Sequence, residues 1–197
     1  MNKWLWILVV IILLGALTAA FLFMDFQAVN SNTAADSQVS SFRIGLEQGE
    51  PPDPFPTLAL YSQKESIFQE TFGQSLESKL YSIPGLNQVE ILSEAVDQAD
   101  NPMFILEFEK IEITWTPIYG RALIEIAIAF ATDGDVSFRH RTPVHFDDGD
   151  SPSMKINGDI QIQDETRGLM SRVAYHKHLE ESVSKAVADI LVAQLSH

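Results

Sequence analysis

The hydrophobic positions divide this chain into an apolar N-terminal run and a longer part in which apolar and polar residues alternate. Residues 4–24 read WLWILVVIILLGALTAAFLFM, with Lys3 before the run and Asp25 after it. A helix of about 20 apolar residues can cross a hydrocarbon core of roughly 30 Å. Because no later segment repeats this pattern, we predict one membrane anchor over residues 1–25.

The alternative for this run is a cleaved signal peptide. Thr18 and Ala20 have a suitable spacing for cleavage after Ala20. The mature chain would then begin with the apolar residues 21–24, which is unusual for an exported protein. An uncleaved signal-anchor is therefore the favoured interpretation.

The charges beside the anchor predict its orientation. Lys3 and the amino terminus are positive, Asp25 begins the other flank, and the next basic residue is Arg43. Positive charge holds a flank in the cytoplasm. We therefore expect a single-pass protein of the cytoplasmic (inner) membrane, with its C-terminal domain outside, in the periplasm of a cell with two membranes.

The segment after the anchor is predicted to be a flexible linker over residues 26–55. It is rich in Ser, Ala, Asn, Gln, Asp and Pro, and Pro51, Pro52 and Pro54 stiffen its end. About 30 residues of flexible coil span roughly 30 Å.

Residues 56–197 have the patterning of one folded domain. Strands alternate with period two and helices repeat every three to four residues. These periods predict strands over 57–61, 89–95, 103–115, 121–131, 136–146 and 154–162, and helices over 62–80 and 167–195. In the strand 103–115 the apolar positions change phase near Glu109 and Lys110, which predicts a β-bulge.

The C-terminal helix is predicted to bury one stripe. Its proposed members are Leu169, Val173, His176, Val183, Val187, Ile190 and Leu195. Strands with one apolar and one polar face suit a sheet covered on one side. The expected fold class is α+β: an N-terminal transmembrane helix, then a two-layer sandwich of a mostly antiparallel sheet with two helices on one face.

Composition narrows the function classes. The chain has 27 acidic and 13 basic residues, and all of the acids but only 12 of the bases lie after Met24, the last residue of the apolar run. A domain of formal charge −15 repels phosphate backbones, so we expect no nucleic-acid partner. The absence of cysteine removes disulfides, thiolate nucleophiles and cysteine-ligated zinc.

No motif predicts a catalytic or metal site. Gly-x-Ser-x-Gly, His-Glu-x-x-His, P-loop and Gly-x-Gly-x-x-Gly sequences are absent. His140 and His145, and likewise His176 and His178, are spaced so that each pair diverges. We expect no enzyme activity, no cofactor and no metal.

Two acidic loops resemble fragments of calcium loops. They are residues 133–135 (Asp-Gly-Asp) and residues 147–150 (Asp-Asp-Gly-Asp). No glutamate closes either loop at the twelfth position, so turn formation explains them more simply.

The turn after the strand 103–115 is the candidate interaction site. Trp115, Pro117, Ile118 and Tyr119 make it apolar where turns are usually polar. Exposed aromatic residues at a rigid tip can bind a partner or enter a membrane interface. The alternative is that Trp115 and Tyr119 fold over the sheet edge to complete the core.

The anchor and the absence of catalytic motifs favour an extracytoplasmic accessory or interaction domain of the bacterial cell envelope, with an envelope protein as partner. The element order also resembles that of small bacterial envelope accessory proteins. One alternative is a carrier of an apolar ligand or lipid, in a pocket formed by Phe104, Phe108, Phe130, Phe138 and Phe146. A second alternative is a hydrolase whose site forms from residues distant in sequence.

Overall fold

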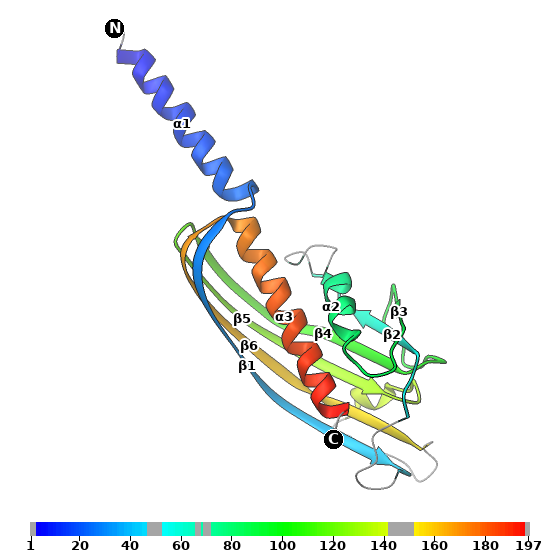
Figure 1. Ribbon diagram of the computed structural model, residues 1–197. Coiled ribbons are helices and arrows are strands. Elements are labelled where there is room, and N and C mark those ends of the chain that lie inside the picture. Colours follow the sequence, from blue (N-terminus) through cyan, green and yellow to red (C-terminus); the bar gives the residue numbers. More distant parts are fainter. Residues whose placement is uncertain (1–2, 47–52, 66–67, 69–71, 142–151, 196–197) are drawn as a thin grey trace.

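The computed structural model describes residues 3–46, 53–65, 68, 72–141 and 152–195. Helix α1 (Lys3–Phe23) extends away from the rest of the molecule (Figure 1). Its 21 residues span about 31 Å at 1.5 Å per residue, which matches a hydrocarbon core. The segment Trp6–Phe23 is apolar enough to cross a membrane and is not buried by the domain. A membrane anchor and a signal sequence share these properties.

The prediction of a flexible linker over residues 26–55 is wrong for most of its length. Residues Gln27–Ile44 form strand β1, which pairs antiparallel with strand β6 (Ser153–Met170) from Gln27 opposite Met170 to Ile44 opposite Ser153. Only residues 24–26 separate α1 from β1. Most residues of the strand are Ala, Ser, Asn, Gln or Asp, which have low strand propensity, and its long partner β6 compensates for that composition.

The sheet has six strands in the order β1-β6-β5-β4-β2-β3. The other strands are β2 (Thr57–Ser62), β3 (Gln88–Ile91), β4 (Met103–Thr116) and β5 (Tyr119–Ala131). Pairing is antiparallel from β1 to β4 and parallel from β4 to β3. The register of β4 shifts between Phe108 and Lys110, which confirms the predicted bulge.

Helices α2 (Phe72–Leu80) and α3 (Arg172–Leu195) cover the concave face of this sheet (Figure 1). The expected α+β sandwich with two helices on one face is therefore confirmed. The core lies between the sheet and these two helices. The sheet contributes Phe104, Leu106, Ile124, Ile126, Phe130, Ile156, Ile160 and Ile162, and the helices contribute Leu76, Leu80, Leu179, Val183, Val187 and Leu191.

Both helices begin later than the sequence predicted. Residues 63–65 are not helical, and the Gln63 N–H instead donates to the Leu106 carbonyl of β4 at 3.0 Å. Residues 167–170 complete β6, and Ser171 caps α3 by accepting a hydrogen bond from the Ala174 N–H at 3.1 Å. The predicted stripe is consequently rotated: Leu169 is 47% exposed and His176 half-buried, while Tyr175 and Leu179 are buried.

The opposite, convex face carries a smaller core at the end distant from α1. Met103, Ile105, Ala129 and Ala131 pack there with Val136 and Phe138. A strand was predicted over residues 136–146. For the described residues of this range the prediction is wrong, because Ser137–His140 form a 3₁₀-helix (η1). Residues 142–151, which include His145, Phe146 and the second acidic loop, lie outside the described residues.

Candidate functional site

The predicted interaction tip lies at the end of the sheet where α1 enters the domain (Figure 1). Pro117 and Ile118 form the turn between β4 and β5. The Gly168 N–H donates to the Ile118 carbonyl at 3.0 Å, and the Met170 N–H donates to the Pro117 carbonyl at 2.9 Å. The turn is therefore hydrogen-bonded to the end of β6 and lies beside the end of α1.

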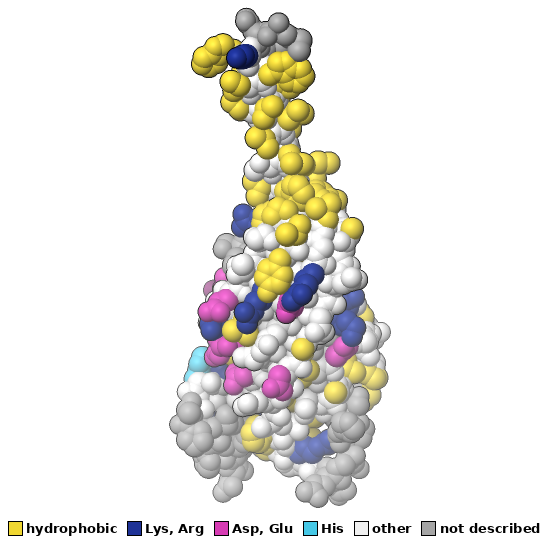
Figure 2. All heavy atoms as spheres, turned by 90° about the vertical axis from the view of Figure 1, so that its left-hand side faces the viewer, with side chains coloured by type: hydrophobic (Ala, Val, Ile, Leu, Met, Phe, Trp, Pro, Cys, Tyr) yellow, Lys and Arg dark blue, Asp and Glu magenta, His cyan; other side chains and the backbone are white. Residues whose placement is uncertain are grey.

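The four tip residues differ in exposure. Ile118 is 67% exposed, whereas Trp115, Pro117 and Tyr119 are half-buried. Exposed apolar side chains nevertheless gather at this end, because Phe23, Met24 and Leu169 are also exposed. We call Phe23, Met24, Ile118 and Leu169 the apolar collar. Figure 2 shows apolar side chains concentrated where the helix joins the domain.

A groove opens beside the last turn of α1. It is lined by Leu22, Ile111, Ile113, Trp115, Arg172 and His176 and encloses about 430 Å³. We call it the anchor groove. Arg172 has no ion pair among the described residues, and the buried Trp115 Nε1 has no hydrogen-bond partner there. One wall is therefore apolar, and the rim carries a guanidinium group.

Asp164, on the helix-facing side of β6, has several hydrogen-bond partners among the described residues. Its side chain is fully buried and accepts four hydrogen bonds. The donors are Thr33 Oγ1 at 2.6 Å, His178 Nε2 at 2.8 Å, Thr166 Oγ1 at 2.9 Å and Tyr175 OH at 3.1 Å. The carboxylate thus joins β1, β6 and α3.

These contacts determine the ionisation of the network. Burial by itself raises the pKa of the Asp164 carboxyl, but hydrogen bonds from His178, Thr33 and Thr166 outweigh it and hold the pKa below its ordinary value. Burial, followed by the charge of Asp164, raises the pKa of the Tyr175 hydroxyl. Asp164 is therefore an anion surrounded by donors.

This arrangement contains an Asp–His pair, and among the described residues no hydroxyl group hydrogen-bonds to His178. The hydroxyl groups of Thr33, Thr166 and Tyr175 all donate to the carboxylate itself. The network therefore acts as a structural brace. The sequence analysis did not identify this network. Continuing the alternation of Ile160 and Ile162 places Asp164 on the buried face, and a charged residue there indicates a buried hydrogen-bond network.

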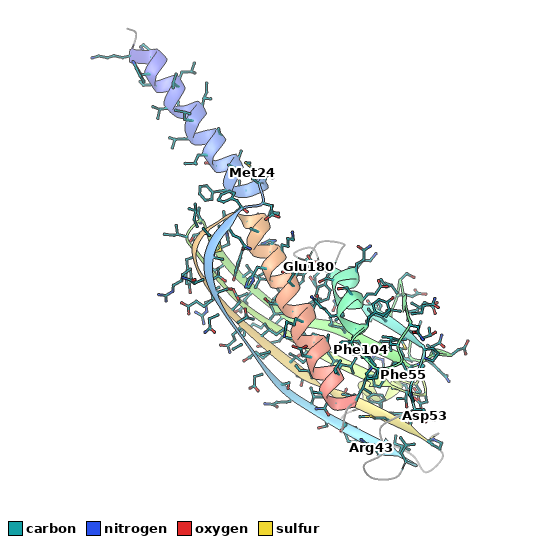
Figure 3. All side chains as sticks on the ribbon, viewed as in Figure 1. Met24, Arg43, Asp53, Phe55, Phe104 and Glu180 are labelled. Carbon is teal, nitrogen blue, oxygen red and sulfur yellow. The ribbon has the colours of Figure 1, made fainter. Side chains whose placement is uncertain are left out.

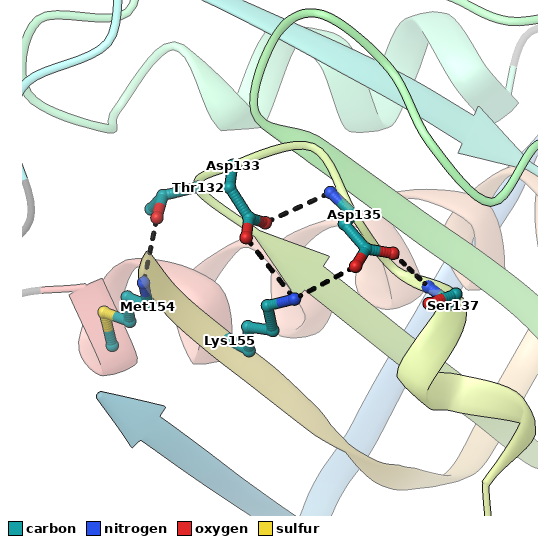
Figure 4. A network of polar contacts seen from close by, with 6 residues as sticks. All are labelled: Thr132, Asp133, Asp135, Ser137, Met154 and Lys155. Atoms are coloured by element: carbon teal, nitrogen blue, oxygen red, sulfur yellow. Dashed lines mark hydrogen bonds and ion pairs between the residues drawn. The ribbon is translucent and has the colours of Figure 1, made fainter. Parts of the chain in front are cut away.

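The acidic motif 133–135 holds a lysine (Figure 4). The Lys155 side chain is 2% exposed, and its Nζ lies 3.4 Å from Asp133 Oδ2 and 3.3 Å from Asp135 Oδ2. The ammonium also lies 5.5 Å from the centre of the Phe138 ring. The lysine supplies the cation between these carboxylates, which makes the motif a clamp for the loop after β5.

The five phenylalanines of the predicted ligand pocket do not share one site. Phe104, Phe108 and Phe130 belong to the core beneath the helices. Phe138 packs on the convex face, and Phe146 lies outside the described residues.

A second groove runs between β1 and α3. It encloses about 320 Å³ and is lined by Thr33, Ala35, Ser37, Ser182, Lys185, Ala186, Asp189 and Ile190. We call it the edge groove, because β1 is the last strand of the sheet.

Comparison with protein-family models and with curated proteins finds no match. Among solved structures, the chain is similar to two crystal forms of the PelC dodecamer from Paraburkholderia phytofirmans, one of them a point variant. The identities are 15% and 16%, and the matches cover 80% and 79% of this chain and 95% and 96% of PelC. Both TM-scores are 0.37, too low to support an argument about function.

Proposed function

We propose that this protein is a single-pass, membrane-anchored domain on the outer side of the cytoplasmic membrane, where it binds an extended segment of an envelope protein along β1. Lys3 and the amino terminus favour a cytoplasmic start for α1. The end of α1 packs on the domain. The centres of the Phe21 and Phe26 rings are 5.2 Å apart, and Leu22 lines the anchor groove. These contacts support retention of the helix.

The observation that carries this proposal is the outer edge of β1, which pairs with no second strand among the described residues. Its 18 residues make an edge of roughly 60 Å at 3.3 Å per residue. Natural edge strands are usually protected by charges, prolines or bulges. In β1 the only charged residues are Asp36 and Arg43, there is no proline, and its register with β6 is unbroken.

Hydrogen bonding shows which part of the β1 backbone faces outward. The Ser171 N–H donates to the Phe26 carbonyl at 3.0 Å. Continuing this alternation, even-numbered residues of β1 bond to β6 and odd-numbered residues direct their N–H and C=O groups to the free side. An added strand would bond to the backbone of residues such as Ala35 and Ser37.

The edge groove lies where such a strand needs side-chain pockets. Main-chain hydrogen bonds give affinity in strand addition, and pockets for alternate side chains give specificity. The groove offers small and polar walls, with the Lys185–Asp189 ion pair of 2.6 Å at its border. We therefore expect a partner segment with small side chains at alternate positions.

A second copy of this chain does not fit as a two-fold partner on β1. Two-fold pairing of one strand with itself is antiparallel, and each β1 begins at its own anchor. The two α1 helices would then leave the pair in opposite directions and could not enter one bilayer. A two-fold dimer through β1 is therefore excluded, and the partner that we propose is a different protein.

The test compares two single substitutions in the full-length protein expressed in its membrane. Ser37→Lys introduces a charge at the free edge, whereas Gln161→Lys introduces the same charge on β6, opposite Asp36 and one strand from the edge. A photo-crosslinking amino acid at Gln38 captures the partner. We expect Ser37→Lys to reduce the cross-linked product at least about tenfold and Gln161→Lys to leave it unchanged.

Equal effects of the two lysines, with both variants folded, would disprove strand addition at β1. Absence of any adduct from Gln38 would do the same.

A further inference from the structure

The connection between α1 and β1 holds the domain close to the end of α1. Residues 24–26 span at most about 11 Å when fully extended. The Phe26 N–H donates to Ser171 Oγ at 3.3 Å, and Lys177 Nζ lies 3.5 Å from Asp25 Oδ2. The headgroup layer on each side of a bilayer is about 5–8 Å thick. When α1 spans a membrane, this end of the domain therefore reaches the headgroup layer.

The strand register places two residues of the apolar collar at this same end. Leu169 of β6 is opposite Ala28, the second residue of β1, and the Gly168 N–H donates to the Ile118 carbonyl at 3.0 Å. Because Met170 is buried beneath the helices, the alternation of β6 directs Leu169 to the convex face. Figure 2 views the molecule from this convex side and shows apolar side chains gathered where α1 joins the domain.

Exposed large apolar side chains are scarce on the rest of the domain. Outside α1 and Met24, the described residues that carry them are Tyr81, Ile91, Ile118 and Leu169. Through its pairing with β2, Ile91 is level with Phe104 at the start of β4, which is distant from Met24 (Figure 3). Residues 104–116 of β4 extend roughly 40 Å at 3.3 Å per residue, and Ile118 follows their other end. Ile118 and Leu169 are thus the exposed apolar residues of the sheet that adjoin the apolar helix.

The charges around the collar suit an anionic surface. The domain is acidic overall, but residues 113–124 and 166–179 contain no acidic residue and four basic ones, which are Arg121, Arg167, Arg172 and Lys177. Asp25 and Glu165, at the same end of the domain, are each paired with one of these bases. Basic residues beside an apolar patch favour binding to a membrane interface that contains anionic lipids.

We infer that the apolar collar inserts into the membrane interface of the leaflet from which α1 emerges, so that the domain rests on the bilayer. Ile118 and Leu169 reach the boundary between headgroups and acyl chains, and the basic residues face the phosphates. Continuity with α1 identifies the occupant, because Phe23 of the collar is the last residue of the helix. This inference rests on the proposed membrane anchoring and is independent of the proposed partner of β1.

The first experiment uses the absence of cysteine from the sequence, which lets one introduced cysteine carry a probe. Ile118→Cys and the control Ile91→Cys are each labelled with nitrobenzoxadiazole in the full chain and reconstituted in nanodiscs of phosphatidylcholine and phosphatidylglycerol. Lipids with a nitroxide near the top of the acyl chain quench a probe that reaches the interface. We expect at least about twofold quenching at residue 118 and none at residue 91.

The intact mass of each purified protein separates the two ways in which this test can fail. A chain shortened after Ala20 would disprove the proposed anchor, and the inference with it. An intact chain whose probe at residue 118 is quenched no more than the probe at residue 91 overturns the insertion of the collar alone.

A second experiment tests the native Ile118 side chain without a probe on it. The label is moved to Leu169→Cys, and Ile118→Asp is compared with Ile91→Asp, which adds the same charge at an exposed isoleucine far from α1. We expect Ile118→Asp to remove at least about half of the quenching at residue 169, because a carboxylate is costly below the headgroups, and Ile91→Asp to leave it unchanged. Equal quenching in the two variants overturns the inference.

Discussion

Strand β6 carries two buried charged residues, and they are stabilised in opposite ways. Lys155 faces the convex side near the distal end and is held by two carboxylates that remain partly exposed. Asp164 faces the helices in the half nearer α1 and is held by neutral hydroxyl groups and His178. The first is a charge-to-charge clamp on a loop, and the second is a hydrogen-bonded brace between β1, β6 and α3.

The comparison shows that burial alone does not determine what a charged residue contributes. If Lys155 is removed, Asp133 and Asp135 can take water, since their side chains are 16% and 37% exposed. If Asp164 is removed, Thr166 and Tyr175 lose their acceptor where water does not reach them. The brace should therefore matter more for stability than the clamp.

The largest expected effect is that of Asp164→Leu. Removal of a buried charge that four donors need should lower the free energy of unfolding by about 3–5 kcal/mol. Urea denaturation measures the loss, and hydrogen exchange should show that β1 loses protection before the other long strands, because Thr33 loses its contact with Asp164. A loss below about 1 kcal/mol, or uniform exchange, would contradict the brace.

Gly120→Ala should have the next largest effect. A Cβ at residue 120 would stand 2.6 Å from two ring atoms of Tyr175 and would displace the ring that donates to Asp164. Overpacking of this kind costs about 1–3 kcal/mol, or roughly 2–12 °C in Tm for a chain of this size.

Gly15→Ala in α1 is the matched control, because a Cβ there meets nothing within 4 Å. If the two alanine variants melt at the same temperature, the close packing of Tyr175 on Gly120 is wrong.

Lys155→Met should lower stability by only about 1 kcal/mol. Removing one member of a buried ion pair is costly when the charge left behind is buried, but the two carboxylates left behind here are 16% and 37% exposed and keep access to water. Thermal denaturation beside Asp164→Leu tests the comparison directly. A loss as large as that of Asp164→Leu would show that the clamp and the brace are equivalent.

The smallest effect is the pH dependence of the brace. The folded pKa of the Asp164 carboxyl lies below the ordinary unfolded value of about 3.9. Its stabilising contribution is therefore complete above that value and is lost as the pH falls through the folded pKa.

Urea denaturation of the wild type and of Asp164→Asn from pH 6 to pH 2.5 measures this effect. The wild type should lose more stability than the variant below about pH 4. Parallel curves for the two proteins would contradict the ionised state of Asp164.

The sequence could predict the part of the site whose residues are adjacent in the chain, but not the part whose residues meet only in the folded structure. Trp115, Pro117, Ile118 and Tyr119 were recognisable because they are adjacent and unusually apolar for a turn. The Asp164 brace was not, since its donors come from residues 33, 166, 175 and 178 and meet only when β1 and α3 pack on β6. The position of the tip residues beside α1 was likewise invisible in the local sequence.

The sequence by itself determined the apolar helix, the α+β class, the bulge in β4 and the one-sided helical cover, because each follows from the period of apolar residues. Only the tertiary structure decided that residues 27–44 form a strand, that residues 167–170 belong to β6, and that residues 137–140 do not continue a strand. A polar segment such as β1 gains little from its own side chains. Its conformation depends on the backbone hydrogen bonds that a partner strand more than a hundred residues away supplies.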